Sequence, residues 1–294
     1  SPIQAEAIPV ALLGNDIIGQ AQTGTGKTAA FGLPMINNLT VKNAIGSIIL
    51  APTRELAIQV HDELVKLTKY EKLNIVAVYG GAPIHLQARD LKRANIVVGT
   101  PGRVLDHIRR GNLPLSTVEF LVLDEADQML LMGFRNEIEA IMKETPKKKQ
   151  ILCFSATMDS SVKKLAYRYM KEPVVVTVKK KEITLSNIKQ DVVETIDREK
   201  RDALCKVLDI DNPFMAIVFC RTKRRADELE TVMHRRGYNC KVIHSDIQQS
   251  KRERIMKSFR NADIQYLIAT DVASRGLDIS GVDNIYNYDI PETA

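Results

Sequence analysis

The sequence lacks several features that mark particular classes of protein. Its four cysteines, Cys153, Cys205, Cys220 and Cys240, show no C-x-x-C spacing and lie in apolar segments. We therefore expect reduced, buried thiols of a cytosolic protein rather than disulfides or zinc ligands. No apolar run approaches the roughly 20 residues that a membrane-spanning helix needs, and the isolated histidines have no metal-ligand spacing. These absences argue against a disulfide scaffold, a metal module and a membrane protein.

The composition is that of a globular protein with more than one domain. The chain has 294 residues, of which 45% are hydrophobic and 27% charged, and this length suits two domains with real cores. The net charge of +6 favours a polyanionic partner, and the basic excess lies in residues 1–180. The alternative is an ordinary solvated basic surface.

Short apolar runs alternate with helical patterns along the whole chain, which predicts an α/β fold with parallel strands. We expect strands at 17–18, 47–50, 75–78, 96–98, 120–123, 151–154, 174–176, 188–195, 215–219, 240–243, 266–269 and 284–288. Helices are expected at 55–69, 84–92, 103–109, 136–143, 161–170, 198–208, 223–235 and 251–259. A polar stretch predicts a linker at 179–187 between domains at 1–178 and 188–294. We expect the second domain to be incomplete, short of its final strand and helix.

A glycine-rich segment, Ala21–Thr28, follows the first apolar run and precedes a helix-forming stretch. Gly24 and Gly26 let backbone N–H groups turn inward, and Lys27 brings a charge suited to the β/γ-phosphates of a nucleotide. The Thr28 hydroxyl is a ligand for Mg²⁺. The alternative is a plain turn with a chance lysine, because Ala21 stands where the usual phosphate-loop pattern has glycine. Pro34 predicts a kink or an early end in the helix that follows.

A buried-strand pattern at 120–123 ends in the acidic run Asp124-Glu125-Ala126-Asp127. Carboxylates at the carboxyl end of a parallel strand lie where open α/β sheets bind nucleotides. Beside a phosphate loop, Asp124 is suited to hold Mg²⁺ through water, and Glu125 to orient and deprotonate an attacking water. The alternative is an acidic first turn of a helix.

Together these segments identify a family. The chain resembles the DEAD-box RNA helicases of superfamily 2 over essentially its whole length, in motifs that occur in family order. The motifs are Pro2-Ile3-Gln4, Ala21–Thr28, Pro52–Ala57, Gly80-Gly81, Thr100–Arg103, Asp124–Asp127, Ser155-Ala156-Thr157, Ile217–Thr222, Gln249-x-x-Arg252 and Ala269–Asp278. The resemblance implies two tandem RecA-like domains with ATP and RNA bound in the cleft between them.

The resemblance also assigns roles to matching residues. It implies catalytic roles for Lys27, Asp124 and Glu125, Mg²⁺ binding by Thr28 and Asp124, and ATP binding by Gln4, Thr23, Gly24, Thr25, Gly26, Lys27, Thr28 and Asp278. It implies that hydrolysis is coupled to RNA work through Ser155, Thr157 and Asp127. The RNA-binding positions are Pro52, Thr53, Arg54, Gly81, Thr100, Gly102, Arg103, Arg221, Gln249, Arg252, Thr270 and Asp271. Gln4 taken alone is equally a surface glutamine, Asp278 a loop carboxylate, and the glycines plain turns.

The chain departs from the family pattern in a few places. Ser245 stands where the family usually has glycine, and Leu131 where a second acid is common. The sequence begins Ser1-Pro2, without the aromatic that precedes the Gln4 motif, and stops at Ala294, before the arginine-rich motif H-R-I-G-R-x-G-R. We therefore expect a core segment of a longer protein that hydrolyses ATP very slowly on its own, since an arginine finger contributes on the order of 10³–10⁵ in rate.

The function implied is that of an ATP-dependent RNA helicase. It would use Mg-ATP hydrolysis to open short duplexes or remodel RNA–protein complexes without sequence preference. Two alternatives remain at this stage: an ATP-gated RNA clamp or assembly platform, and a DNA-directed superfamily 2 motor. We expect a cytoplasmic monomer with RNA as partner, protein regulators and no membrane association.

Overall fold

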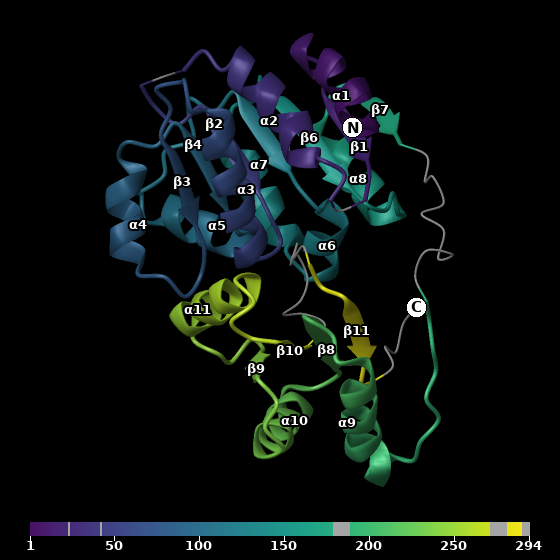
Figure 1. Ribbon diagram of the computed structural model, residues 1–294. Helices are drawn as coiled ribbons and strands as arrows, with labels where there is room; N and C mark the ends of the chain where they lie inside the picture. Colours follow the sequence, from purple (N-terminus) through teal and green to yellow (C-terminus); the bar gives the residue numbers. More distant parts are fainter. Residues whose placement is uncertain (23, 42, 179–188, 271–280, 290–294) are drawn as a thin grey trace. The chain divides into compact units, whose positions relative to one another are not determined.

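A computed structural model describes residues 1–22, 24–41, 43–178, 189–270 and 281–289. The chain divides into two compact units, Ser1–Lys181 and Glu182–Ala294 (Figure 1). Each unit is a parallel sheet flanked by helices, which confirms the α/β class predicted from the alternating pattern. The predicted linker at 179–187 lies outside the described residues.

The first unit contains a seven-stranded parallel sheet in the order β3-β4-β2-β5-β6-β1-β7. The strands are β1 (Ile17–Gln20), β2 (Ser47–Leu50), β3 (Ile75–Val78), β4 (Ile96–Gly99), β5 (Phe120–Leu123), β6 (Gln150–Ser155) and β7 (Val174–Thr177). The central strands β2, β4, β5 and β6 are buried along their whole length, so they appear in the sequence as continuous apolar runs.

Helices cover both faces of this sheet. Their bounds are α1 (Pro2–Leu12), α2 (Lys27–Asn38), α3 (Arg54–Leu67), α4 (Ile84–Leu91), α5 (Pro101–Arg109), α6 (Ala126–Leu131), α7 (Arg135–Glu144) and α8 (Ser160–Tyr169). Helices α1, α2 and α3 pack on one face through residues such as Ile3, Phe31 and Val60. Helices α4 to α8 pack on the other, where Val104 and Leu165 join the core.

The second unit has a four-stranded parallel sheet in the order β11-β8-β10-β9. Its elements are η2 (Asp197–Glu199), α9 (Lys200–Asp211), β8 (Ala216–Cys220), α10 (Lys223–Arg235), β9 (Cys240–Ile243), α11 (Gln249–Arg260), β10 (Tyr266–Thr270) and β11 (Asn284–Asn287). Helices α9 and α10 pack on one face through Leu208 and Leu229. Helix α11 packs on the other through Phe259.

Two expectations about these elements were wrong. Residues 189–195, expected to lie in a strand, form no regular structure, and Val192 is 89% exposed. β-Branched residues form a strand only where a neighbouring strand pairs with them, and none of the described strands does so here. Helix α2 also does not end early at Pro34 but continues to Asn38, because burial of Phe31 and Met35 outweighs the hydrogen bond that proline cannot donate. A kink at this proline stays a prediction.

Helix α1 was not among the expected elements. Pro2 and Pro9 both argue against a helix when the segment is examined alone. Pro2 occupies the first turn, where its missing N–H has no intrahelical partner in any case. Ile3, Ala7 and Ala11 recur every four residues and are fully buried against the sheet and α2, so tertiary packing forms this helix.

Candidate functional site

The loop between β1 and α2 has the backbone geometry of a phosphate cradle. Gly24 and Gly26 adopt φ values of 76° and 86°, a left-handed conformation that favours glycine. Gly26 caps α2, so the first N–H groups of this helix face the loop. A Cβ at Gly26 would lie 2.5 Å from Gln4 Nε2, so a larger residue here would displace the Gln4 side chain. Thr28 is buried in the first turn of α2.

Lys27 and Asp124 face each other across this cradle. Their Nζ and Oδ1 atoms are 3.8 Å apart, and both side chains are nearly fully buried. Neither of these two atoms has a hydrogen-bond partner among the described residues. A buried ammonium and a buried carboxylate oxygen without partners are costly in a folded protein. Their retention side by side fits a site for a polyphosphate and its cation.

The environment of Asp124 is strongly perturbed. Burial raises the pKa of its carboxyl to about 6, although the Lys27 charge opposes the shift and Glu125 adds to it. A bound cation would reverse this balance by favouring the carboxylate. The perturbed acid next to a buried lysine whose ammonium makes no hydrogen bond to the described residues is the kind of arrangement found at functional sites.

Glu125 links β5 to α6 in an unusual backbone conformation. Its φ of 53° and ψ of 53° are left-handed, which is costly for a residue with a Cβ. The residue is 5% exposed and caps α6. Asp124 and Glu125 are thus successive acidic residues at the carboxyl end of β5, and β6 is the neighbouring strand.

The next strand in the sheet, β6, brings the predicted coupling residues together. Asp127 Oδ2 accepts hydrogen bonds from the Thr157 backbone N–H (2.9 Å) and from its hydroxyl (2.8 Å). The Asp127 N–H donates to Ser155 Oγ at 3.3 Å. The Ala21 N–H donates to the Ser155 carbonyl at 3.0 Å, which ties the phosphate loop to the same strand end. Strands β1, β6 and β5 are neighbours, so the three motifs that follow them meet at one sheet edge.

Gln4 also contacts the cradle, from α1. Its Nε2 donates to the Gly26 carbonyl at 3.1 Å. The sequence places these residues in separate motifs, whereas the structure connects them directly. Thr25, also in the loop, donates its hydroxyl to the Gln22 carbonyl at 2.7 Å.

A second group of predicted residues lies at the carboxyl ends of β2, β4 and β3, which are neighbours in the same sheet. Pro52 and Thr53 precede α3, and the Thr53 hydroxyl caps this helix by accepting from the Leu56 N–H at 3.2 Å. A Cβ at Gly80 would lie 3.3 Å from Arg54 Nη2, so the arginine lies against the turn. Gly81 has a φ of 87°.

The last motif of this group opens helix α5. Thr100 precedes the helix, Gly102 is exposed in its first turn, and Arg103 is half-buried. Arg103 Nη1 donates to the Ala82 carbonyl at 2.9 Å, next to Gly81. The fold therefore brings together the first-domain positions that the resemblance assigns to RNA.

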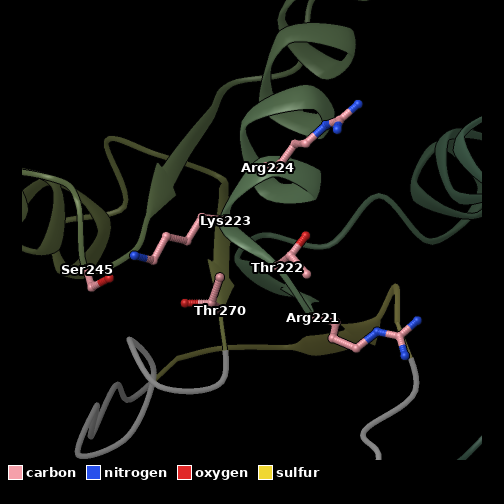
Figure 2. A pocket seen from close by; sticks show the side chains of 6 residues that line it. All are labelled: Arg221, Thr222, Lys223, Arg224, Ser245 and Thr270. Carbon is pink, nitrogen blue, oxygen red and sulfur yellow. The ribbon is translucent and has the colours of Figure 1, made fainter.

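The second unit has an open pocket of about 460 Å³ lined by Arg221, Thr222, Lys223, Arg224, Ser245 and Thr270 (Figure 2). Lys223 extends toward Ser245, whereas Arg224 points away from both (Figure 2). Lys223 Nζ donates to Asp246 Oδ1 at 2.6 Å. The cations and hydroxyls suit a phosphodiester backbone.

Of these six residues, Arg221 and Thr270 were predicted from the sequence to bind RNA, whereas Thr222, Lys223, Arg224 and Ser245 were not assigned to a site. Lys223 and Arg224 open α10 just after Arg221 and Thr222, at the end of β8, and Ser245 follows β9. Their positions after strands were the available signal.

Two other predicted residues do not line this pocket. Gln249 and Arg252 are buried on α11. Arg252 Nη1 donates to the His244 carbonyl at 3.1 Å, and Gln249 Nε2 donates to Glu253 Oε1 at 3.0 Å. Their RNA-binding role stays a prediction. Thr23, Asp271 and Asp278 lie outside the described residues.

Some classes of site are absent from what the structure describes. Among residues 1–22, 24–41, 43–178, 189–270 and 281–289, no group of histidine, cysteine and acidic residues could hold a metal ion by itself. None of the helices formed by these residues is both long and apolar enough to cross a membrane.

The fold and cradle define a nucleotide-binding α/β protein with a phosphate loop and an acidic strand end. Residues 1–165 match the family model for DEAD/DEAH box helicases, and residues 199–294 match the helicase conserved C-terminal domain. The chain therefore belongs to the DEAD/DEAH box helicase family.

Individual proteins similar to this chain belong to the same family. The chain is 53% identical over 294 residues to the DEAD-box ATP-dependent RNA helicase CshA of Bacillus cereus, a match that covers 99% of this chain and 56% of that protein. The chain thus spans little more than half the length of this relative. A Methanococcus jannaschii DEAD box protein structure matches with a TM-score of 0.60 and 44% identity, covering 100% of this chain and 80% of that one. Saccharomyces cerevisiae Dbp5 bound to RNA and ADP BeF3 matches with a TM-score of 0.87 and 32% identity, covering 99% of this chain and 75% of that one.

Proposed function

We propose that this chain is the catalytic core of an ATP-dependent RNA helicase that opens short RNA duplexes or remodels RNA–protein complexes. The observation that carries the proposal is the pair Lys27 and Asp124, buried 3.8 Å apart beside a glycine-rich helix start, with neither Nζ nor Oδ1 hydrogen-bonded to any described residue. This arrangement is costly unless a triphosphate and a cation occupy it.

In this proposal Lys27 binds the β- and γ-phosphates, and the N–H groups at the start of α2 bind their oxygens. Mg²⁺ fits the oxygen donors of Thr28 and Asp124, the latter largely through water. When bound, it neutralises charge on the phosphate oxygens. Gln4, which contacts Gly26, recognises the adenine edge with its amide, together with Asp278 at the ribose.

Glu125 acts as the general base. A water molecule oriented by its carboxylate attacks the γ-phosphorus, the bond from phosphorus to the bridging oxygen breaks, and ADP and phosphate form. The proton of the water passes to Glu125. The hydrogen bonds that Asp127 N–H donates to Ser155 Oγ and that Asp127 Oδ2 accepts from the Thr157 hydroxyl couple this change at the end of β5 to the end of β6.

RNA is held through its backbone by residues of both units. Hydroxyls, glycines and cations gather at the ends of β2, β3 and β4 and line the pocket of the second unit. These groups are suited to contacts with phosphate and sugar. The RNA-bound Dbp5 structure supports this partner. A cytoplasmic location, a monomeric state and protein regulators are part of the same proposal.

The test uses full-length protein that contains this chain. We expect steady-state ATPase activity that single-stranded oligouridylate stimulates, and ATP-dependent displacement of one strand from a short RNA duplex. Absence of RNA stimulation would contradict the proposal. Stimulation without strand displacement would instead indicate an ATP-gated clamp.

A further inference from the structure

Gln87, on α4, is a buried glutamine that joins two of the candidate RNA-binding motifs. The residue is 7% exposed. Its Nε2 donates to the Tyr79 carbonyl at 3.1 Å, directly before the turn at Gly80 and Gly81. Its Oε1 accepts from Arg103 Nη1 at 2.9 Å, on α5. One side-chain amide therefore connects the end of β3 to the helix that carries Arg103.

A third partner fixes the direction of this amide. His107 Nε2 lies 3.1 Å from Gln87 Oε1. Because a guanidinium only donates, the Gln87 oxygen must face Arg103, and His107 must then carry its proton on Nε2. The remaining nitrogen, Nδ1, accepts from Asn112 Nδ2 at 3.4 Å. Burial lowers the pKa of His107, and the Arg103 charge lowers it further while Asp106 opposes this, which favours the neutral ring that these hydrogen bonds require.

Arg103 is held at one end only. Its Nη1 donates to both Gln87 Oε1 and the Ala82 carbonyl, each at 2.9 Å. Among the described residues, no hydrogen-bond partner is found for Nε or Nη2 of Arg103. The guanidinium is thus oriented by the protein and keeps donors for a ligand. Arg54, which lies against Gly80, is close enough to lower the pKa of Arg103, after the larger effect of burial.

We propose that Gln87 is a positioning residue for RNA binding: it holds the Arg103 guanidinium and the Gly80-Gly81 turn in one fixed arrangement before RNA arrives. This inference rests on the proposed function. An arginine oriented in advance loses less side-chain entropy when it binds a phosphate, so affinity rises without any contact between Gln87 and RNA.

The test measures the dissociation constant for a short oligouridylate at a saturating non-hydrolysable ATP analogue. We expect Gln87→Met, which keeps the length of the side chain but removes the hydrogen bonds, to weaken RNA binding about tenfold. In steady-state ATPase assays the KM for RNA should rise while kcat at saturating RNA stays near that of wild type. Gln87→Glu keeps an acceptor for Arg103 and His107 and should recover part of the affinity.

A double-mutant cycle separates positioning from loss of fold. Because Gln87 acts in large part through Arg103, Gln87→Met should weaken RNA binding clearly less in an Arg103→Ala background than in wild type, and the remaining effect is that of the released Gly80-Gly81 turn. The matched control is Gln150→Met, because Gln150 is equally buried but donates to the Ala11 and Asn15 carbonyls, away from these motifs. This control should lower the melting temperature and leave RNA affinity unchanged.

Two results would overturn the inference: unchanged RNA affinity in Gln87→Met, or an effect that simply adds to that of Arg103→Ala. If Gln87→Met lowers the melting temperature strongly, the RNA affinity of Gln87→Glu becomes the deciding measurement. A Gln87→Glu protein that binds RNA as weakly as Gln87→Met would count against the inference. If wild-type protein binds no RNA at all, the proposed function fails instead.

Discussion

At the scale of single residues, the candidate site contains groups that lower the stability of the folded protein, through backbone strain or through buried charge. Glu125 is buried in a left-handed conformation, and Lys27 and Asp124 are buried without hydrogen bonds for Nζ and Oδ1 among the described atoms. Strain and unsatisfied charge of this kind persist where function requires them. Two substitutions distinguish the roles of these residues.

Glu125→Gln should stop turnover while ATP and RNA still bind. The amide keeps the size of the side chain and its hydrogen bond to water, but it cannot accept the proton. We expect ATPase activity to fall at least about 10²-fold, since general-base catalysis contributes roughly 10²–10⁴. The measurement is RNA-stimulated ATPase of the full-length protein, with the exposed Glu144→Gln as control. Activity within a few-fold of wild type would exclude Glu125 as the base.

Lys27→Ala should act on binding itself. The substitution removes a charge partner of the β/γ-phosphates and leaves the buried Asp124 carboxyl without the cation that lowers its pKa. We expect the dissociation constant for ATP to rise by at least about tenfold, measured by titration with a fluorescent ATP analogue. Unchanged ATP affinity in this variant would mean that Lys27 does not contact the phosphates.

At the scale of elements, the strand ends of the second unit are tied together by one buried carboxylate. Asp289 follows β11 and accepts from the Arg221 N–H at 3.0 Å and from Lys200 Nζ at 3.0 Å. Lys200 and Arg225 also lie over the Tyr288 ring. Asp289 thereby joins β11, α9 and the turn after β8 that carries Arg221 into the pocket.

This arrangement predicts a pH dependence of stability. Burial alone would raise the pKa of Asp289, but the Arg221 N–H and the Lys200 ammonium outweigh it, so the pKa lies below its ordinary value. Its stabilising contribution is therefore fully present above the unfolded-state pKa, about 3.9, and is lost as the pH falls through the lower folded-state value. Asp289→Asn should melt at a lower temperature at neutral pH, and its difference from wild type should shrink on acidification below about pH 4. Melting curves across this range test it; a difference that grows with acid would contradict it.

At the scale of the whole molecule, RNA affinity should depend on salt and hardly on sequence. The candidate contacts in both units are cations, hydroxyls and glycines, which meet the backbone rather than base edges. Unrelated single-stranded RNAs should show the same slope of log affinity against log salt. Arg103→Ala should weaken all of them and reduce that slope by about 0.7, the value for one lost contact to a single strand. Filter binding at several salt concentrations measures this, and a strong preference for one base sequence would count against it.

Much of the fold and the site was predictable because the signals are local in the chain. The apolar runs of β2, β4, β5 and β6 are continuous because these strands are buried on both faces. The glycines of the phosphate loop are adjacent to Lys27, and Asp124 directly follows a strand, so the sequence alone placed both at strand ends. The segment 189–195 was wrongly predicted to be a strand, and helix α1 was not predicted. The structure of each depends on whether other parts of the chain pack against it.

The sequence by itself determined the α/β class, the motif order and the presence of residue types suited to phosphate, since these follow from local pattern and side-chain chemistry. Only the tertiary structure decided which distant groups meet. It set Asp127 against Thr157, Gln4 against Gly26 and Gln87 between Tyr79 and Arg103. It also raised the pKa of Asp124, because burial is a property of the packed sheet rather than of the neighbouring residues in the chain.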